Sequence, residues 1–297
     1  MPHTTHIKDI LANGTTASFE LFPPKTPKGL KQIYQTISKL KDLNPDFFSV
    51  TYGAGGSTAE RSLEIASAIT NLAQVPCVAH FTCVGMNKEQ VLELLQSLEF
   101  HGINNVLALR GDPPKGETSF TQPEGGFAYA NELVAYIKEH SNVGILVAGY
   151  PEGHTENPSK DDDFSHLVEK VKAGADGIVT QAFFDNRELF DFSERLQKAG
   201  LNTPLSCGIF PVSNPKQIQR IIELSGATVH KKLLAGIDKY QDDPESMEAF
   251  GTDFCIEQVS QLLDHGIKAF HFYTMNRARQ TTRVLEALKD SFPSLKF

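Results

Sequence analysis

The sequence predicts an α/β fold, a (β/α)8 TIM-type barrel with extra helices between strands seven and eight. Eight short apolar segments recur along the 297 residues, and a stretch with helical periodicity follows each of them. Strict alternation of strands and helices implies parallel pairing through right-handed crossovers. Eight such units favour a closed barrel over an open doubly wound sheet.

The predicted strands are mostly near-continuous apolar runs, which suit parallel strands covered on both faces. They span residues 17–22, 47–52, 77–82, 105–109, 144–150, 177–181, 204–209 and 269–274. An open Rossmann-type sheet is the alternative fold. It is disfavoured because no G-x-G-x-x-G pattern follows the first strand, and the glycine-rich segment 53–57 lacks the lysine of a P-loop.

Apolar residues at helical spacing fill the gaps between the strands. Helices are expected near residues 33–40, 63–69, 91–98, 133–138, 164–171, 189–196, 218–224 and 284–288. Three of them are followed by Gly102, Gly174 and Gly200, since glycine readily takes the left-handed conformation that ends a helix.

The gap between strands seven and eight is the longest, at about 60 residues. It predicts one or two extra helices, roughly at residues 233–240 and 245–265. No repeat or linker marks a domain boundary, so residues 1–297 are predicted to form a single catalytic barrel domain.

Composition and charge narrow the class of protein. The net charge of −8, from 28 basic and 36 acidic residues, disfavours nucleic acid and membrane surfaces as partners. No apolar run is long enough to span a bilayer, and the N-terminus has no apolar signal core, so we expect a cytoplasmic protein. Its four cysteines show neither C-x-x-C nor zinc-ligand spacing and are predicted to be buried free thiols.

Polar residues follow or end every predicted strand. In such barrels, residues at the carboxyl ends of the strands face the active-site mouth. The residues expected there, in chain order, are Glu20; Thr51 and Tyr52; His80 and Thr82; Arg110 and Asp112; Tyr150, Glu152 and His154; Thr180 and Gln181; Ser213 and Asn214; and His271, Tyr273, Asn276 and Arg277. This set predicts a mouth for an organic cofactor or a flat ring substrate.

Each of these residues also has a structural alternative. Glu20 is alternatively a buried carboxylate paired with an arginine, His80 a core histidine, the segment 110–112 a turn with an ion pair, and Tyr150 and Tyr273 core aromatics with bonded hydroxyls. The aspartates at 161–163 suit a solvated helix start. No metal is expected, because there is no H-E-x-x-H motif and no carboxylate pair at ligand spacing.

Nine segments, taken in order, resemble the bacterial-type catalytic domain of methylenetetrahydrofolate reductases. They are SFELFPPK at 18–25, FSVTYGA at 48–54, AHFTC at 79–83, ALRGD at 108–112, VAGYPEGH at 147–154, KAGAD at 172–176, TQAFFD at 180–185, GIFPV at 208–212 and HFYTMNR at 271–277. The resemblance covers roughly residues 15–290.

This resemblance implies a barrel that binds FAD without a Rossmann fold. It implies reduction of 5,10-methylenetetrahydrofolate to 5-methyltetrahydrofolate with NADH or NADPH, the two substrates taking turns at the flavin, and a supply of methyl groups for methionine synthesis. It further implies a homo-oligomer. Preference between the two nicotinamides is not visible in the sequence, and NADH is favoured by analogy with bacterial relatives.

The resemblance also assigns roles to residues. Glu20 would be the general acid that protonates N10 of the folate, with burial in an apolar mouth bringing its pKa near the working pH. Asp112 would lie near the flavin and the pterin ring, and Gln181 would position the folate. The substrate-contact positions are Glu20, Gln181, Gln217 and Arg277. The FAD positions are Thr51, Tyr52, Ala54, His80, Leu109, Arg110, Gly111, Asp112, Tyr129, Ala148, Tyr150, His154, Asp163, His166 and Lys170.

Three positions depart from the pattern of some relatives. Glu169 stands in place of an arginine, His166 in place of an asparagine, and Ile221 in place of an aromatic that stacks on nicotinamide or folate. Two other function classes remain open from the residues. One is a different barrel enzyme, such as a pterin-binding methyltransferase or an aldolase, although no Schiff-base lysine lies at a strand end; the other is a non-catalytic binding barrel.

Overall fold

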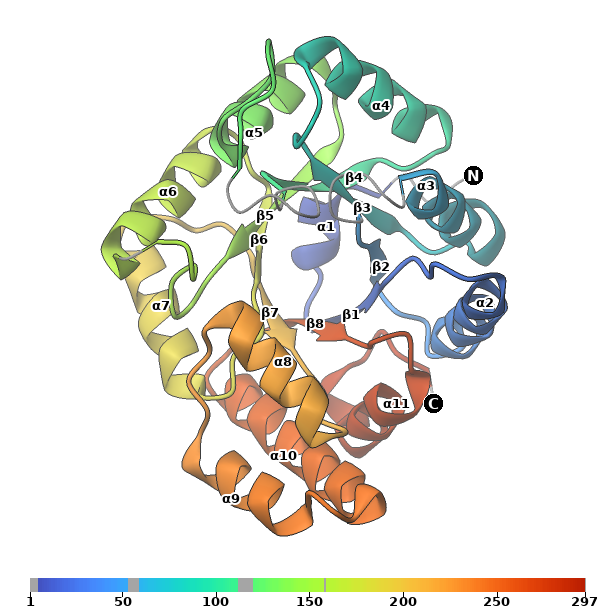
Figure 1. Cartoon of the computed structure of the whole chain (residues 1–297), viewed down its shortest axis with the longest axis vertical. Helices are drawn as coiled ribbons and strands as arrows, with labels where there is room; N and C mark the ends of the chain where they lie inside the picture. The colour runs from blue at the N-terminus through green and yellow to red at the C-terminus, as the bar shows by residue number, and fades with distance from the viewer. Residues whose placement is uncertain (1–4, 53–58, 112–119, 158, 297) are drawn as a thin grey trace.

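The computed structural model describes residues 5–52, 59–111, 120–157 and 159–296. Eight parallel strands within these ranges close into a barrel in the order β1 to β8, with β8 pairing back to β1 (Figure 1). Helices surround the strands as an outer ring. The predicted (β/α)8 barrel is therefore confirmed.

All eight predicted strands are present, with ends within two residues of their predicted positions. They are β1 (Thr16–Leu21), β2 (Phe47–Val50), β3 (Cys77–Thr82), β4 (Asn105–Leu109), β5 (Gly144–Gly149), β6 (Gly177–Thr180), β7 (Leu205–Ile209) and β8 (Ala269–Tyr273). The largest difference is at β2, because Thr51 and Tyr52 continue the run of strand-forming residues but belong to the loop that lines the cavity described below.

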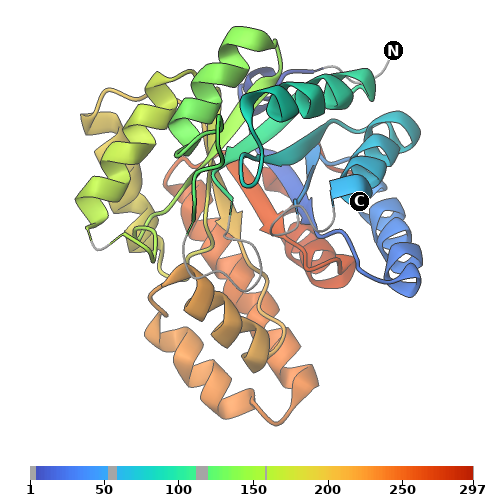
Figure 2. The same cartoon turned by 45° about the horizontal axis from the view of Figure 1, so that its top comes forward.

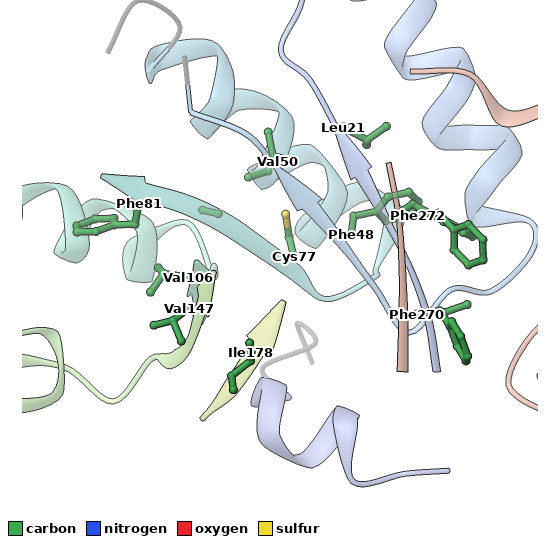
Figure 3. Close-up of a cluster of buried hydrophobic side chains, with 14 of the residues drawn as sticks. Leu21, Phe48, Val50, Cys77, Phe81, Val106, Val147, Ile178, Phe270 and Phe272 are labelled. Atoms are coloured by element: carbon green, nitrogen blue, oxygen red, sulfur yellow. The ribbon is translucent and has the colours of Figure 1, made fainter. Parts of the chain in front are cut away.

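Successive residues of each strand alternate between two separate apolar layers. Side chains that face the helices, such as Phe48 and Phe272, form the main core, and Figure 3 labels members of this cluster on strands β1 to β6 and on β8. Side chains that face the barrel interior, such as Phe47, Val78 and Leu107, form a second cluster. The barrel is thus a packed body rather than a pore.

The helices begin and end where local chemistry favours it. Thr26, Asn87, Ser159, Asn214 and Asp243 each accept a hydrogen bond from a first-turn backbone N–H, as N-caps do. The helices are α1 (Ile7–Leu11), α2 (Pro27–Lys41), α3 (Ala59–Ala68) with the π-helical turn η2 (Ile69–Ala73), α4 (Lys88–Phe100), α5 (Ala130–His140), α6 (Lys160–Lys172), α7 (Asn186–Lys198), α8 (Pro215–Ser225), α9 (Lys231–Tyr240), α10 (Pro244–Asp264), α11 (Ala278–Ala287) and the short η3 (Lys289–Ser291).

The glycines expected to follow helices have the predicted conformation. The backbone φ angles of Gly102, Gly174 and Gly200 are 77°, 122° and 72°, all in the region that other residues avoid. The aspartates at 161–163 occupy the first turn of α6, where carboxylates suit the helix dipole. None of the helices in the described ranges is long and apolar enough to cross a membrane.

The extra helices between β7 and β8 are α9 and α10, as predicted. However, α10 contacts both α7 and α11, so the last of the inserted helices occupies a place in the outer ring. Helices α8 and α9 project from one side of the barrel, as Figures 1 and 2 show. They pack with α10 and with the segments after β6 and β7 into a third apolar cluster that includes Phe184, Phe210, Leu233 and Met247.

Helix α1, which the sequence did not predict, covers the amino ends of the strands. Ile7, Ile10 and Leu11 are buried and join the interior cluster, and Figure 1 shows α1 within the ring of strands. The backbone N–H of Ile7 donates to Oδ1 of Asn105, the first residue of β4, at 2.7 Å. The barrel is therefore closed at one end by α1, which leaves the carboxyl ends of the strands for a site.

Candidate active site

A cavity of about 800 Å³ lies at the carboxyl ends of the strands. This volume is in the range of small-molecule and cofactor sites. Among the described residues, every member of the predicted FAD set lines it: Thr51, Tyr52, His80, Leu109, Arg110, Gly111, Tyr129, Ala148, Tyr150, His154, Asp163, His166 and Lys170. Glu20 and Gln181 line it too. Ala54 and Asp112 lie outside the described residues.

Two predicted substrate contacts do not line this cavity. Gln217 lies in the first turn of α8, where its side chain accepts a hydrogen bond from Ser213 Oγ at 2.6 Å. Arg277 is the exposed N-cap residue of α11. Both residues follow the carboxyl ends of strands, so they lie at the cavity end of the barrel without forming its wall.

Glu20 projects from β1 into a cluster of polar side chains. Its Oε2 lies 3.3 Å from Nε2 of His80 and 3.7 Å from Nε2 of His271. Burial raises the pKa of Glu20, but the interactions of its carboxylate with His271 and His80 outweigh burial and lower the pKa to about 2. The expectation that an apolar mouth brings this pKa near the working pH is therefore wrong. The partners of Glu20 are two histidines and not the arginine offered as the structural alternative.

His271 anchors this cluster from inside the barrel. It is 1% exposed, and its ring stacks on Phe47 with centroids 5.6 Å apart. Nδ1 lies 2.7 Å from Ser18 Oγ, and Nε2 lies 3.0 Å from Ser49 Oγ. The sequence placed His271 on the last strand, but only closure of β8 against β1 brings it to these partners.

Two buried polar atoms on the cavity wall lack a hydrogen bond within the described structure. They are Nε2 of His80, whose contact with Glu20 is not aligned as a hydrogen bond, and Oγ1 of Thr82. Nearby, Gly111 has φ of 93°, and a Cβ there would lie 3.0 Å from Val84. Unpaired buried polar groups are costly, so the wall is suited to a ligand that supplies polar partners and approaches the backbone closely.

Positive charge lines one side of the cavity. Lys170 of α6 donates a hydrogen bond to the carbonyl oxygen of Ala148 at 2.6 Å. Burial lowers the pKa of Lys170 to about 8, and the charge of Asp163 opposes this shift. Arg110 forms an ion pair with Glu156 at 2.6 Å, as its structural alternative proposed. Arg110 nevertheless lines the cavity. Both cations are placed where an anionic group of a ligand would meet them.

Aromatic rings edge the same side. Tyr129 and His166 stack with centroids 6.3 Å apart and planes 10° from parallel, and Tyr129 is 59% exposed. Glu169, one of the departures noted above, does not line the cavity; its carboxylate accepts from Asn131 and lies 3.5 Å from Nδ1 of His166. The exposed pair of rings is a suitable surface for stacking a heteroaromatic ring.

The sequence missed several wall residues. Phe22, Phe210 and Met275 lie on loops after strands, and Ser225 reaches the cavity from α8. Ile221, one of the departures noted above, also reaches the cavity from α8. Tyr273 lines the cavity, as expected of a site residue, and its hydroxyl donates to the carbonyl oxygen of Thr180 at 2.6 Å, as expected of an aromatic with a bonded hydroxyl. Phe22, Phe210 and Met275 are apolar and gave no signal of a site, except that each follows a strand.

Known proteins similar to this chain agree with this architecture. Residues 6–289 match the family model described as methylenetetrahydrofolate reductase. The chain is 34% identical over 271 residues to the 5,10-methylenetetrahydrofolate reductase of Escherichia coli (strain K12), covering 91% of this chain and 90% of that protein. It is 39% identical over 291 residues to "Methylenetetrahydrofolate reductase (NADH) 1" of Arabidopsis thaliana, covering 94% of this chain and 49% of the plant protein.

The chain thus spans about half the length of the plant relatives and about nine-tenths of the bacterial ones. Solved structures support the fold. An uncharacterized protein from Clostridium thermocellum, described as binding two copies of 5-methyl-5,6,7,8-tetrahydrofolic acid, superposes with a TM-score of 0.63 at 16% identity, covering 96% of this chain and 98% of that one. Because the family model matches nearly its whole length, this chain belongs to the methylenetetrahydrofolate reductase family.

Proposed function

We propose that this chain reduces 5,10-methylenetetrahydrofolate to 5-methyltetrahydrofolate, using NADH or NADPH as reductant and FAD as the bound cofactor. The observation that carries the proposal is the single cavity wall on which Glu20, Gln181 and the described members of the FAD set meet. When bound, FAD would take a hydride from the nicotinamide and pass it to the methylene carbon of the folate, in alternating steps. The product would supply methyl groups for methionine synthesis.

The wall fits such a cofactor. Lys170 and Arg110 would offset the charge of the diphosphate, since both are cations at the cavity surface. The stacked pair Tyr129 and His166 would hold the adenine ring against its exposed face. His80 and Thr82, whose buried polar atoms lack partners, would meet polar atoms of the ring system.

Glu20 would supply the proton for the folate. Opening the methylene bridge breaks a C–N10 bond, and N10 takes up a proton as the bond breaks. His271 and His80 lower the pKa of Glu20, so the proton that Glu20 passes on would be supplied through this neighbouring cluster. His80 lines the cavity and lies 3.3 Å from Glu20, which suits it to return that proton.

Gln181 would orient the folate. Its Oε1 accepts a hydrogen bond from the backbone N–H of Ala182 at 2.9 Å, which fixes the side chain and leaves the amide nitrogen to donate to a ligand. Tyr273 and Ile221 complete this part of the wall. Asp112, Gln217 and Arg277 remain proposed substrate contacts.

The Glu20→Gln variant tests the proposal. The amide keeps the size of the side chain but cannot donate an acid proton, so folate reduction should fall by about 100-fold or more. The rate at which NADH reduces the flavin should fall far less. This rate is measured in the absence of folate, from the loss of the visible absorbance of the flavin. Equal loss of both half-reactions would contradict the role of Glu20, and a native protein that cannot be loaded with FAD would contradict the proposed function itself.

A further inference from the structure

The loop after β5 contacts the carboxyl-terminal end of α8, the helix that follows β7. The Oε2 atom of Glu152 accepts a hydrogen bond from the backbone N–H of Thr228 at 2.7 Å. Thr155, three residues along the same loop, lies against Gly226, which ends α8 with φ of 68°. A Cβ at Gly226 would come within 2.9 Å of the methyl group of Thr155. One polar contact and one packing contact therefore join the same two segments.

The second oxygen of the Glu152 carboxylate is buried behind the cavity wall. Oε1 has no hydrogen-bond partner within the described ranges, and Glu152 borders a pocket of about 10 Å³ together with Gln181 and Ser225. This pocket holds no group larger than a water molecule, so it is not a ligand site. Gln181 and Ser225 also line the main cavity, whereas Glu152 does not. Glu152 was expected at the active-site mouth but lies one layer behind the wall.

The two joined segments differ in how firmly they are held. In the loop after β5, backbone hydrogen bonds of 3.1 Å and 2.9 Å close two turns within residues 150–157, and Glu156 pairs with Arg110. Residues 226–229 have, within the described ranges, no hydrogen bond to a part of the chain outside α8 other than the bond to Glu152. Loss of Glu152 should therefore free the end of α8 and leave the loop in place.

We propose that Glu152 is a positioning residue for the substrate side of the cavity. It holds the carboxyl-terminal end of α8 and thereby fixes the places of Ile221 and Ser225 in the wall beside Gln181. This inference rests on the proposed function, because that part of the wall is the part assigned to the folate. Ile221 lies about one turn before Ser225, so movement of the helix end moves both side chains.

The position of Glu152 assigns it to substrate binding and not to proton transfer. It is separated from the main cavity by the wall residues, so its removal leaves the proton donor and the cofactor contacts in place. A wall that is no longer fixed must be ordered when the substrate binds, and this ordering costs affinity. Loss of an interaction that acts equally on the bound substrate and on the transition state weakens binding without slowing the chemical step.

The first test measures the contact without turnover, by hydrogen–deuterium exchange of the FAD-loaded protein. In Glu152→Ala, the backbone amides of residues 222–228 should exchange about tenfold faster or more, while those of residues 150–157 should stay near their native rates. Glu152→Gln should restore the native exchange, because its amide oxygen can still accept from Thr228. Glu223→Ala is the matched control, since it removes an exposed carboxylate from the same helix.

The second test separates substrate binding from chemistry. Glu152→Ala should raise the folate concentration at half-saturation by about tenfold, with the limiting rate of folate reduction changed by less than about threefold and FAD affinity near native. Glu152→Gln should recover most of the loss. Gly226→Ala disturbs the same contact from the α8 side, because alanine is strained at φ of 68°, and it should have the same effect as Glu152→Ala.

Four results would overturn the role of Glu152. They are unchanged exchange of residues 222–228 in Glu152→Ala, equal loss of FAD affinity and folate affinity, no recovery in Glu152→Gln, and the same effects from Glu223→Ala. Native protein that binds FAD and is reduced by NADH but does not turn over the folate would instead overturn the proposed function, and the exchange result would still decide whether Glu152 holds the end of α8.

Discussion

At the scale of single residues, the charge of Lys170 is sensitive to mild alkaline pH. Its amine is held against the carbonyl oxygen of Ala148, and burial lowers its pKa from 10.5 to about 8. A lowered pKa means that the folded protein loses this charge as pH rises through about 8, well before a solvent-exposed lysine would. A ligand that depends on Lys170 for charge should therefore bind less tightly above that pH.

FAD binding should show this dependence. We expect the dissociation constant for FAD to rise between pH 7 and pH 9 in the native chain, because the diphosphate loses a cationic partner. Lys170→Gln should weaken binding by about tenfold at pH 7 and abolish most of the pH dependence. Quenching of FAD fluorescence measures both quantities. Lys172→Gln, an exposed neighbour on α6 outside the cavity wall, is the control, and a native pH slope retained by Lys170→Gln would refute the assignment.

The sequence identified single residues of the site better than their partners. Glu20, His80 and His271 were all expected at strand ends, yet Glu20 was expected beside apolar groups or an arginine. The partners of Glu20 depend on closure of the barrel, which brings residues separated by about 250 positions into contact, as Ser18 and His271 are. Periodicity and local motifs carry no information about such a contact.

At the scale of elements, the turn after β8 links the two ends of the barrel sequence. Met275 and Asn276 both have positive φ, 49° and 56°, which is uncommon for residues other than glycine and often marks a functional site. The side chain of Asn276 accepts from the backbone N–H of Phe22 at 2.9 Å and donates to its carbonyl oxygen at 2.7 Å. Thr274 Oγ1 donates to the carbonyl oxygen of Glu20 at 2.7 Å. This turn therefore fixes the strand end that carries Glu20.

Two variants of Asn276 separate its hydrogen bonds from its backbone conformation. Asn276→Gly keeps access to positive φ and should lower the free energy of unfolding by about 1–3 kcal/mol through loss of the two hydrogen bonds. Asn276→Ala should cost roughly another 1 kcal/mol, because alanine disfavours positive φ. Urea denaturation measures both values. If alanine proved no less stable than glycine, the left-handed turn would not be a constraint on the folded chain.

Among the elements, the sequence predicted the helices of the long insertion but not their places. Periodicity located α9 and α10 within two residues, since each has an apolar face. It did not show that α10 packs between α7 and α11, because an apolar face does not specify which neighbour covers it. Helix α8, which precedes these two helices, carries Ile221 and Ser225 to the cavity wall.

At the scale of the whole molecule, the two ends of the barrel have different roles: one end is closed by apolar packing and the other holds the cavity. Its amino end is closed by α1, whose apolar residues lie in the interior cluster with Phe47 and Leu107. Its carboxyl end holds the cavity. Five residues are too few for helical periodicity to identify, so α1 was not predicted, although Ile7, Ile10 and Leu11 have the i, i+3, i+4 spacing of a helix face.

Truncation of Ile7 tests this separation. Ile7 is fully buried, so Ile7→Ala should lower the free energy of unfolding by about 2–4 kcal/mol through lost burial and the cavity left behind. FAD affinity and both half-reactions measured well below the melting temperature should stay near native values, because the change lies at the opposite end of the barrel. Lys8→Ala, an exposed change on the same helix, should alter stability by less than about 0.5 kcal/mol. A loss of FAD affinity in Ile7→Ala under conditions where it remains folded would show that the two ends are coupled through the strands, and that α1 helps to shape the cavity.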